Sequence, residues 1–212
     1  MRVLVLCDDY WHPGDVARTG LSQLTKAGFE FDWVENMQEW SVKDVANYPV
    51  VLLTKSNNMS SSNKSPWMTP EIELAFQDYV RQGKGLVAIH SGTAGYDEST
   101  GIRNLLGGLF KHHPAQCQVT IEFQKGHPLA VADTLFTVFD EHYFMDTEPG
   151  DDVFLTTRSE NGVQPGGWTR LEGQGRVCVL TPGHNLAVWL HSDYQALIQR
   201  AILWASGEKV SR

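Results

Sequence analysis

Cysteine is scarce in this sequence, and its copies lie far apart. The 212 residues include three cysteines, Cys7, Cys117 and Cys178. No C-x-x-C pair occurs, which excludes the cysteine patterns of zinc fingers and of thioredoxin-like redox proteins. We expect three buried thiols in a reducing compartment, because a chain of this length can bury a core without disulfides.

Basic clusters and long apolar runs are also absent. The chain carries 17 Lys and Arg residues against 25 Asp and Glu residues, which gives a formal net charge of -8. Such a surface repels phosphate backbones, so we do not expect a nucleic-acid partner. The apolar run over residues 3–7 is too short to cross a membrane, and no charged leader precedes it. We therefore expect a cytoplasmic protein without a membrane partner.

The first half of the chain alternates apolar strand patterns with amphipathic helical patterns. Strands are predicted over residues 2–7, 29–34, 48–54 and 85–89, and most of these runs are continuous, as in strands covered on both faces. One helix is predicted over 16–27, and a second runs from Pro70, with Thr69 as its N-cap, up to Gly83. This alternation indicates βαβ units and a parallel sheet.

The second half of the chain has short strand patterns and few helices. Strands are predicted over 116–123, 135–139, 153–157 and 176–181, followed by a closing helix over 193–206. We expect these strands to be antiparallel additions to the sheet edge or an excursion from the sheet. No internal repeat or linker divides the chain, so a single α/β domain over residues 1–212 is the simplest organisation, with three layers and a central, mostly parallel, flavodoxin-like sheet.

Polar side chains follow three of the predicted central strands. Ligands of open α/β sheets bind outside the carboxyl ends of the strands, so the loops after Cys7, Thr54 and Ile89 are the places to search. The polar residues that open these loops are Asp8, Asp9 and His12, then Lys55 in a Ser- and Asn-rich loop, and then His90 and Ser91.

The sharpest local signal is the turn His90-Ser91-Gly92. A buried strand breaks there into small residues, a geometry that lifts one side chain above the sheet as a nucleophile elbow does. The motif is not G-x-S-x-G, and Ser91 as a nucleophile would need a base and an oxyanion hole that the sequence does not identify. His90 has the chemistry of a general base, a metal ligand or a sugar-binding group; the alternative is a structural histidine that bonds the turn.

A set of motifs in chain order resembles the trehalose-utilisation (ThuA-like) family. The set consists of His90-Ser91-Gly92, then Gly107-Gly108-x-Phe110-x-x-His113, Asp140-Glu141-x-Tyr143, Gly173-x-Gly175-Arg176-Val177, Gly183-His184 and the terminal Ala201-Ile202-x-Trp204-Ala205. The match covers most of the chain, and it is the ordered set rather than any single motif that carries the resemblance.

The resemblance implies a fold similar to that of class I glutamine amidotransferases. In those enzymes a catalytic cysteine follows the strand that here ends at His90, and Cys7, on another strand, does not replace it in the sequence. We therefore do not expect glutamine hydrolysis. The resemblance implies a role in carbohydrate metabolism instead, with oxidised (3-keto) disaccharides as the class of substrate.

Candidate site residues follow from the strand ends and from the family motifs. The candidate catalytic residues are His90, Glu141 and His184, and the candidate substrate-binding residues are His12, Trp11, Ser91, His113 and Tyr143. Neighbouring side chains such as those of His112 and His113 point apart, and the family pattern favours His113. Trp67 and Trp168 join Trp11 as predicted loop tryptophans that can stack on a sugar.

The sequence does not identify a cofactor. His90, His113, His184 and Glu141 are ligand types that suit zinc, but no close spacing such as H-E-x-x-H links them. The leading hypothesis is a carbohydrate-processing enzyme that uses histidine-assisted proton transfer on a small-molecule sugar. The alternatives are a non-catalytic sugar- or partner-binding module and a metal-dependent hydrolase; homo-oligomerisation is also open.

Overall fold

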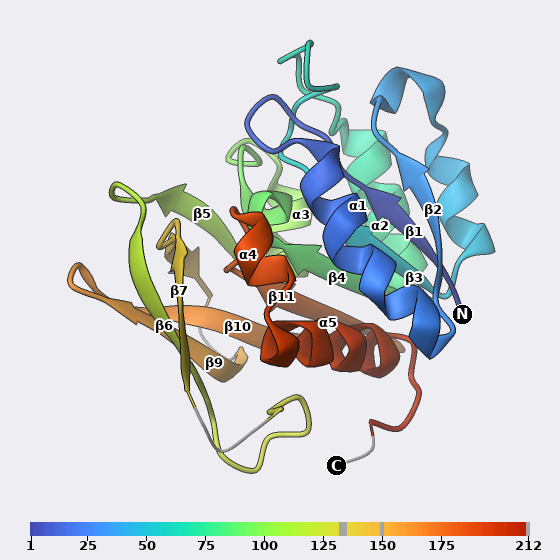
Figure 1. The fold of residues 1–212 in the computed structure, drawn as a ribbon. Helices are drawn as coiled ribbons and strands as arrows, with labels where there is room; N and C mark the ends of the chain where they lie inside the picture. The colour runs from blue at the N-terminus through green and yellow to red at the C-terminus, as the bar shows by residue number, and fades with distance from the viewer. Residues whose placement is uncertain (132–134, 149–150, 211–212) are drawn as a thin grey trace.

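One large mixed sheet organises the molecule (Figure 1). The computed structural model describes residues 1–131, 135–148 and 151–210. Within these residues the sheet has nine strands in the order β2-β1-β3-β4-β11-β10-β9-β6-β7, and β5 pairs with β8 in a separate ribbon. The strands of the parallel half are β1 (Arg2–Leu6), β2 (Glu30–Val34), β3 (Val50–Leu53), β4 (Gly85–Ile89) and β11 (Gly175–Leu180). The remaining strands are β5 (Gly108–His112), β6 (Cys117–Phe123), β7 (Phe136–Asp140), β8 (Phe144–Thr147), β9 (Asp152–Ser159) and β10 (Gly162–Glu172).

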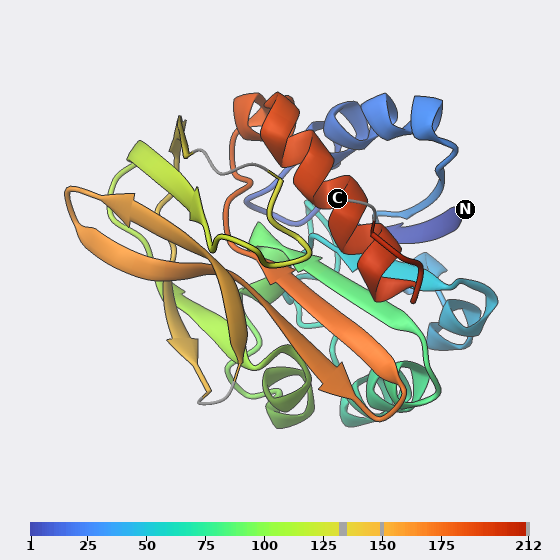
Figure 2. The ribbon, with the colours of Figure 1, turned by 90° about the horizontal axis from the view of Figure 1, so that it is seen from below.

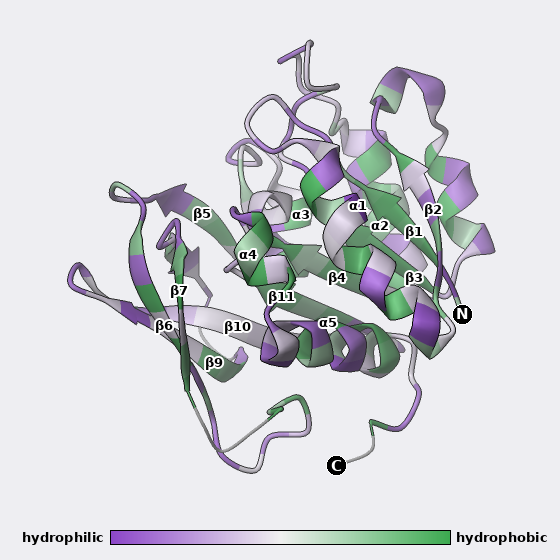
Figure 3. Cartoon of the chain, viewed as in Figure 1, coloured by the Kyte–Doolittle hydropathy of each residue, from purple (hydrophilic) through white to green (hydrophobic). Residues whose placement is uncertain are grey.

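Helices cover both faces of the parallel half (Figure 2). One face packs against α1 (Gly14–Ser22), α4 (Leu186–Trp189) and α5 (Ser192–Ala205), and the other against α2 (Pro70–Arg81) and α3 (Thr100–Leu106). The alternate residues of β1 divide between these two cores, Val3 and Val5 on the first and Leu4 and Leu6 on the second. Apolar side chains on both faces therefore hold β1 between the layers, as the continuous apolar run predicts, and Figure 3 shows the hydrophobic central strands.

The predicted helices form with small changes at their ends. Residues 16–27 divide into α1, which begins at Gly14, and a 3₁₀ turn over Gln23–Ala27 that ends at the left-handed Gly28. The Thr69 side chain caps α2 by accepting a hydrogen bond from the Ile72 N–H. Further 3₁₀ turns cover Met37–Glu39, Val42–Asn47 and His90–Thr93. No helix in the described ranges is long and apolar enough to span a membrane.

The antiparallel additions are present in the second half, with one exception. β10, β9, β6 and β7 continue the sheet in antiparallel pairs. β11 lies in the middle of the sheet instead and is parallel to β4. Because four successive antiparallel steps separate β11 from β7, both strands point the same way and end at the same side of the sheet as β1 and β4.

Two tryptophans expected in loops are buried in the core, although Trp67 does lie in the loop between β3 and α2. Trp168 lies in the interior of β10 with 0% exposure, and Trp67 is 2% exposed. Each indole N–H donates to a backbone carbonyl, to Leu106 from Trp168 and to Ser56 from Trp67. Neither ring is free to stack on a sugar, so that prediction is wrong for both.

Candidate functional site

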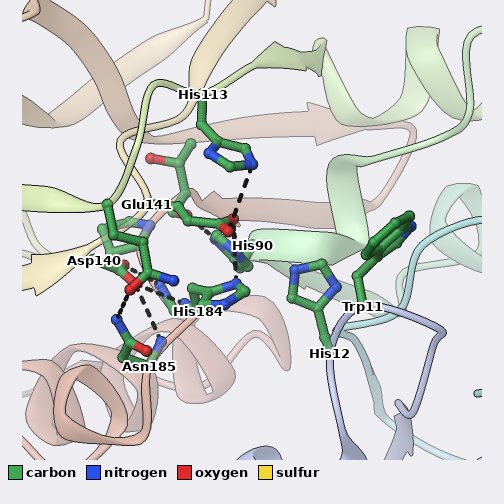
Figure 4. A network of polar contacts seen from close by, with 12 residues as sticks. Trp11, His12, His90, His113, Asp140, Glu141, His184 and Asn185 are labelled. Atoms are coloured by element: carbon green, nitrogen blue, oxygen red, sulfur yellow. Dashed lines mark hydrogen bonds and ion pairs between the residues drawn. The ribbon is translucent and has the colours of Figure 1, made fainter.

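Four titratable side chains meet at the carboxyl edge of the sheet (Figure 4). They are His12 from the loop after β1, His90 after β4, Glu141 after β7 and His184 after β11. One nitrogen or oxygen from each lies within 4.8 Å of those of the other three. We call these four residues the His₃Glu cluster. The structure thus brings together the three candidate catalytic residues and adds His12, which the sequence placed among the substrate-binding residues.

His90 forms the floor of the cluster. Its backbone lies in the left-handed region with φ of 48°, an uncommon conformation for a residue with a side chain. The turn is tight, because a Cβ atom on Gly92 would lie 2.0 Å from the Leu53 carbonyl oxygen. His90 is 1% exposed, and Tyr143 stacks on its ring at 3.9 Å between centroids. The turn therefore holds the His90 side chain in a buried position, whereas the small-residue pattern predicted only that one side chain is lifted above the sheet.

The two ring nitrogens of His90 have different surroundings. Nδ1 lies 2.8 Å from the Thr181 carbonyl oxygen, which can only accept, so Nδ1 carries the proton. Nε2 is buried and has no hydrogen-bond partner among the described residues, although it lies 3.4 Å from Oε2 of Glu141. Burial lowers the pKa of His90. The neutral ring therefore directs an unprotonated nitrogen at Glu141.

Asp9 holds His12 in place, a role that the sequence analysis missed. The Asp9 carboxylate is 1% exposed and accepts hydrogen bonds from the backbone N–H groups of Trp11, His12 and Ser56. It also lies 2.9 Å from Nδ1 of His12. Burial raises the pKa of Asp9, but the contacts with His12 and the backbone donors outweigh burial and lower the pKa to about 2. The spacing Asp-x-x-His directly after a buried strand is the signal in the sequence for this pair.

Asp140 holds the turn that carries His184. Its carboxylate, with 0% exposure, accepts hydrogen bonds from the backbone N–H groups of Gly183, His184 and Asn185 at 2.8, 3.0 and 3.2 Å. A flat sheet would separate β7 from β11 by roughly 19 Å, four strand spacings. The sheet must therefore curve, and Asp140 fastens its end back to the loop after β11.

Glu141 is the centre of the contacts between these side chains. Oε2 lies 3.2 Å from Nδ1 of His184 and 3.4 Å from Nε2 of His90, and Oε1 lies 3.5 Å from Nε2 of His113. Burial raises the pKa of Glu141, but His184 and His90 together outweigh burial and lower the pKa well below its usual range. The same contact raises the pKa of His184. Glu141 is therefore a carboxylate at neutral pH.

A cavity of about 530 Å³ opens above the cluster. His12, Glu141 and His184 line it, together with predicted binding residues and parts of the Ser- and Asn-rich loop. The predicted binding residues that line the cavity are Trp11, His113 and Tyr143. The loop contributes Ser56, Asn57 and Asn58. Trp11 is 64% exposed and free to contact a ligand. The sequence indicated only that the loop is polar, since nothing in its composition shows what it faces.

Two predicted site residues do not reach this cavity. His90 lies beneath it, behind Glu141 and Tyr143, and is not a lining residue. Ser91 has 0% exposure and faces a separate space of about 20 Å³. A buried hydroxyl with no hydrogen-bond partner among the described residues has neither the base nor the access that a nucleophile needs.

The cysteines do not supply an amidotransferase nucleophile. Cys7 and Cys178 are buried, and burial raises the pKa of the Cys7 thiol to about 12. Cys117 lies on β6 and is only half-buried, so the prediction of three buried thiols is correct for two. With His90 at the elbow and Cys7 protonated, the site does not hold the thiolate of a class I glutamine amidotransferase.

The fold and the turn at His90 define a protein of the flavodoxin-like, class I glutamine amidotransferase-like α/β class, with histidine at the position of the nucleophile. The family model for ThuA, described as trehalose utilisation, matches residues 2–205. The chain belongs to this family. The sequence has no significant match among curated proteins.

Solved structures share this fold at low sequence identity. A ThuA-like protein from Parabacteroides merdae superposes with a TM-score of 0.81 at 19% identity, covering 100% of this chain and 92% of its own. A cytoplasmic protein from Salmonella typhimurium gives 0.72 at 15% identity, covering 97% and 99%. A β-galactosidase from Bacillus circulans gives 0.69 at 15% identity, covering 98% of this chain but 31% of its own. At these identities the likeness concerns the fold alone.

Proposed function

We propose that this protein is a carbohydrate-processing enzyme that moves a proton at a carbon next to a sugar carbonyl. A 3-keto disaccharide or a related keto sugar is the proposed substrate. The convergence of three histidines and a carboxylate beneath the 530 Å³ cavity is the observation that carries this proposal. The description of the family as trehalose utilisation supports a carbohydrate as the ligand.

The cavity has the lining that a sugar needs. Exposed Trp11 offers an apolar ring face, on which a sugar ring can stack. Asn58 and Asp97 offer amide and carboxylate groups that can bond hydroxyls. The volume is within the range of small-molecule sites.

His113 is the proposed base. Its Nδ1 lies 2.7 Å from the Pro114 carbonyl oxygen and therefore carries the proton, which leaves Nε2 as an acceptor. That nitrogen lies 3.5 Å from Oε1 of Glu141, and His113 lines the cavity. Once Nε2 takes a proton, the Glu141 carboxylate beside that nitrogen stabilises the imidazolium; in catalytic triads the carboxylate bonds the other ring nitrogen instead.

The proposed step is an enolisation. The C–H bond next to the carbonyl breaks, the proton goes to Nε2 of His113, and the electron pair forms a C=C bond as the carbonyl oxygen gains negative charge. His12 and His184 also line the cavity and are the proposed partners of that oxygen. His90, the base favoured by the sequence, lies beneath the cavity and is not among its lining residues, so it is not the proposed base.

Exchange of hydrogen for deuterium tests this step directly. The protein is incubated with 3-keto-trehalose in D₂O, and NMR follows the C–H signals next to the carbonyl. We expect exchange faster than in the enzyme-free solution and a loss of about 10²- to 10⁴-fold in His113→Ala. His112→Ala is the matched control, because this exposed neighbour stacks on Phe144 and does not line the cavity.

Two results would contradict the proposal. Exchange at the enzyme-free rate, with calorimetry showing that the sugar binds, would support a non-catalytic sugar-binding module. Equal exchange by His113→Ala and the wild type would remove His113 from the step.

A further inference from the structure

The contact between His90 and Glu141 in the His₃Glu cluster lacks the proton that would make it a good hydrogen bond. Nε2 of His90 and Nδ1 of His184 are both buried and lie within ion-pair distance of Oε2 of Glu141. Neither nitrogen makes a hydrogen bond within the described residues. At the floor of the cluster, where Nδ1 of His90 is committed to Thr181, an unprotonated nitrogen faces a carboxylate. A cation between the two would resolve this contact.

We propose that His12, His90, Glu141 and His184 bind a divalent transition-metal ion, with zinc as the first choice. Three imidazoles and one carboxylate are ligands that suit zinc. The sequence-derived ligand set had His113 in place of His12; in the structure His113 contacts the other oxygen of Glu141.

The spacing of the ligand atoms agrees with a shared ion. Ligands at about 2.1 Å from a tetrahedral ion lie about 3.4 Å from each other. The distances from Oε2 of Glu141 to His184 and His90 are 3.2 and 3.4 Å, whereas N–H···O hydrogen bonds centre near 2.9 Å. The ring centroids of His12, His90 and His184 lie 5.0 to 5.6 Å apart with their planes steeply inclined, so the three rings surround one point.

The groups behind the ligands have the arrangement of a metal site. Metal-binding histidines usually donate their second N–H to a carboxylate or a backbone carbonyl, which fixes the tautomer. Nδ1 of His12 bonds the Asp9 carboxylate, and Nδ1 of His90 bonds the Thr181 carbonyl. In both rings Nε2 is therefore the unprotonated nitrogen that is left to bind an ion.

The site does not depend on the proposed substrate. An ion there would polarise a carbonyl or hydroxyl oxygen in the cavity if it accepted that oxygen as a fifth ligand, and His113 would remain outside the coordination shell as a proton carrier. Metal binding and deuterium exchange are separate measurements, so either proposal can fail without the other.

Calorimetric titration with zinc tests the site. The full chain is freed of metal with a chelator and titrated with Zn²⁺, and elemental analysis counts the bound ions. We expect one ion per chain and a rise in Tm on loading, because an ion that binds only the folded state stabilises it. Glu141→Gln and His12→Gln should each weaken binding by more than about 100-fold, beyond the usual effect of outer partners.

His112→Gln is the matched control and should bind zinc as the wild type does. His12 belongs to a partly exposed loop, so His12→Gln keeps the test valid even if a change at buried Glu141 impairs folding. A wild-type protein that binds no zinc would overturn the proposal. So would zinc binding that is equally tight in wild type and His12→Gln, since that would place the ion elsewhere.

Discussion

At the scale of single residues, two buried carboxylates position histidines of the His₃Glu cluster. Asp9 and Asp140 are 1% and 0% exposed, and each accepts several backbone N–H groups. Neither lines the large cavity. They act on a ligand only through His12 and His184, and so they are positioning residues.

The bond between Asp9 and His12 yields a prediction on affinity. Asp9→Asn keeps the size of the side chain but removes the charge that fixes the His12 tautomer. We expect zinc affinity to fall about 10- to 100-fold, as measured by calorimetric titration. Asp8→Asn is the control, since Asp8 bonds the Gly14 N–H outside the cluster and asparagine tolerates its positive φ. Equal losses in both variants would show that the Asp9–His12 bond has no special part in binding.

At the scale of elements, the end of β7 must stay attached to the loop after β11. Asp140 makes this attachment through three backbone hydrogen bonds. Asp140→Ala leaves three N–H groups without their acceptor, and the loss at the buried Gly183 N–H alone costs roughly 1–3 kcal/mol. We expect the free energy of unfolding in urea to fall by more than about 2 kcal/mol and zinc affinity to fall with it.

Asn185→Ala is the matched control for that prediction. The Asn185 side chain donates to Gln116 and to the Phe139 carbonyl in the same turn, but it is only partly buried. Its loss should cost less than about 1 kcal/mol. If the two variants proved equally stable, Asp140 would not be what holds β7 to this loop.

Sequence patterns predicted elements well where the pattern itself is local. The apolar runs of β1, β3 and β4 and the cap at Thr69 need only their own neighbours. The position of β11 beside β4 and the curve that returns β7 depend on pairing between distant strands, which no short pattern records. For the same reason the sequence predicted Trp168 in a loop: its surroundings come from α3 and from the second half of the sheet.

The sequence predicted which residues belong to the candidate site better than it predicted how they are arranged. The strand-end rule selected His12 and His90, and the family motifs selected Glu141, His184 and His113. Which of them faces the cavity follows from side-chain directions: His90 points beneath Glu141, and Ser91 points away. The support from Asp140 was missed because it consists of bonds to backbone groups, whereas the spacing Asp-x-x-His is a local signal for the support from Asp9.

At the scale of the whole molecule, the fold does not determine the chemistry, which depends on the residues of the site. A similar fold forms part of a much longer β-galactosidase chain, and one fold serves many functions. In this chain, four strand ends meet below a cavity with the volume of a small-molecule site, and the elbow carries histidine. The central claim is therefore that the His₃Glu cluster is a metal centre at the floor of that cavity.

An anomalous difference map at the zinc edge, from a crystal of the zinc-loaded protein, tests this claim most directly. The account predicts one strong peak about 2.0–2.2 Å from Nε2 of His12, Nε2 of His90, Oε2 of Glu141 and Nδ1 of His184. A map without a peak inside the cluster, or with its strongest peak at another site, would contradict it.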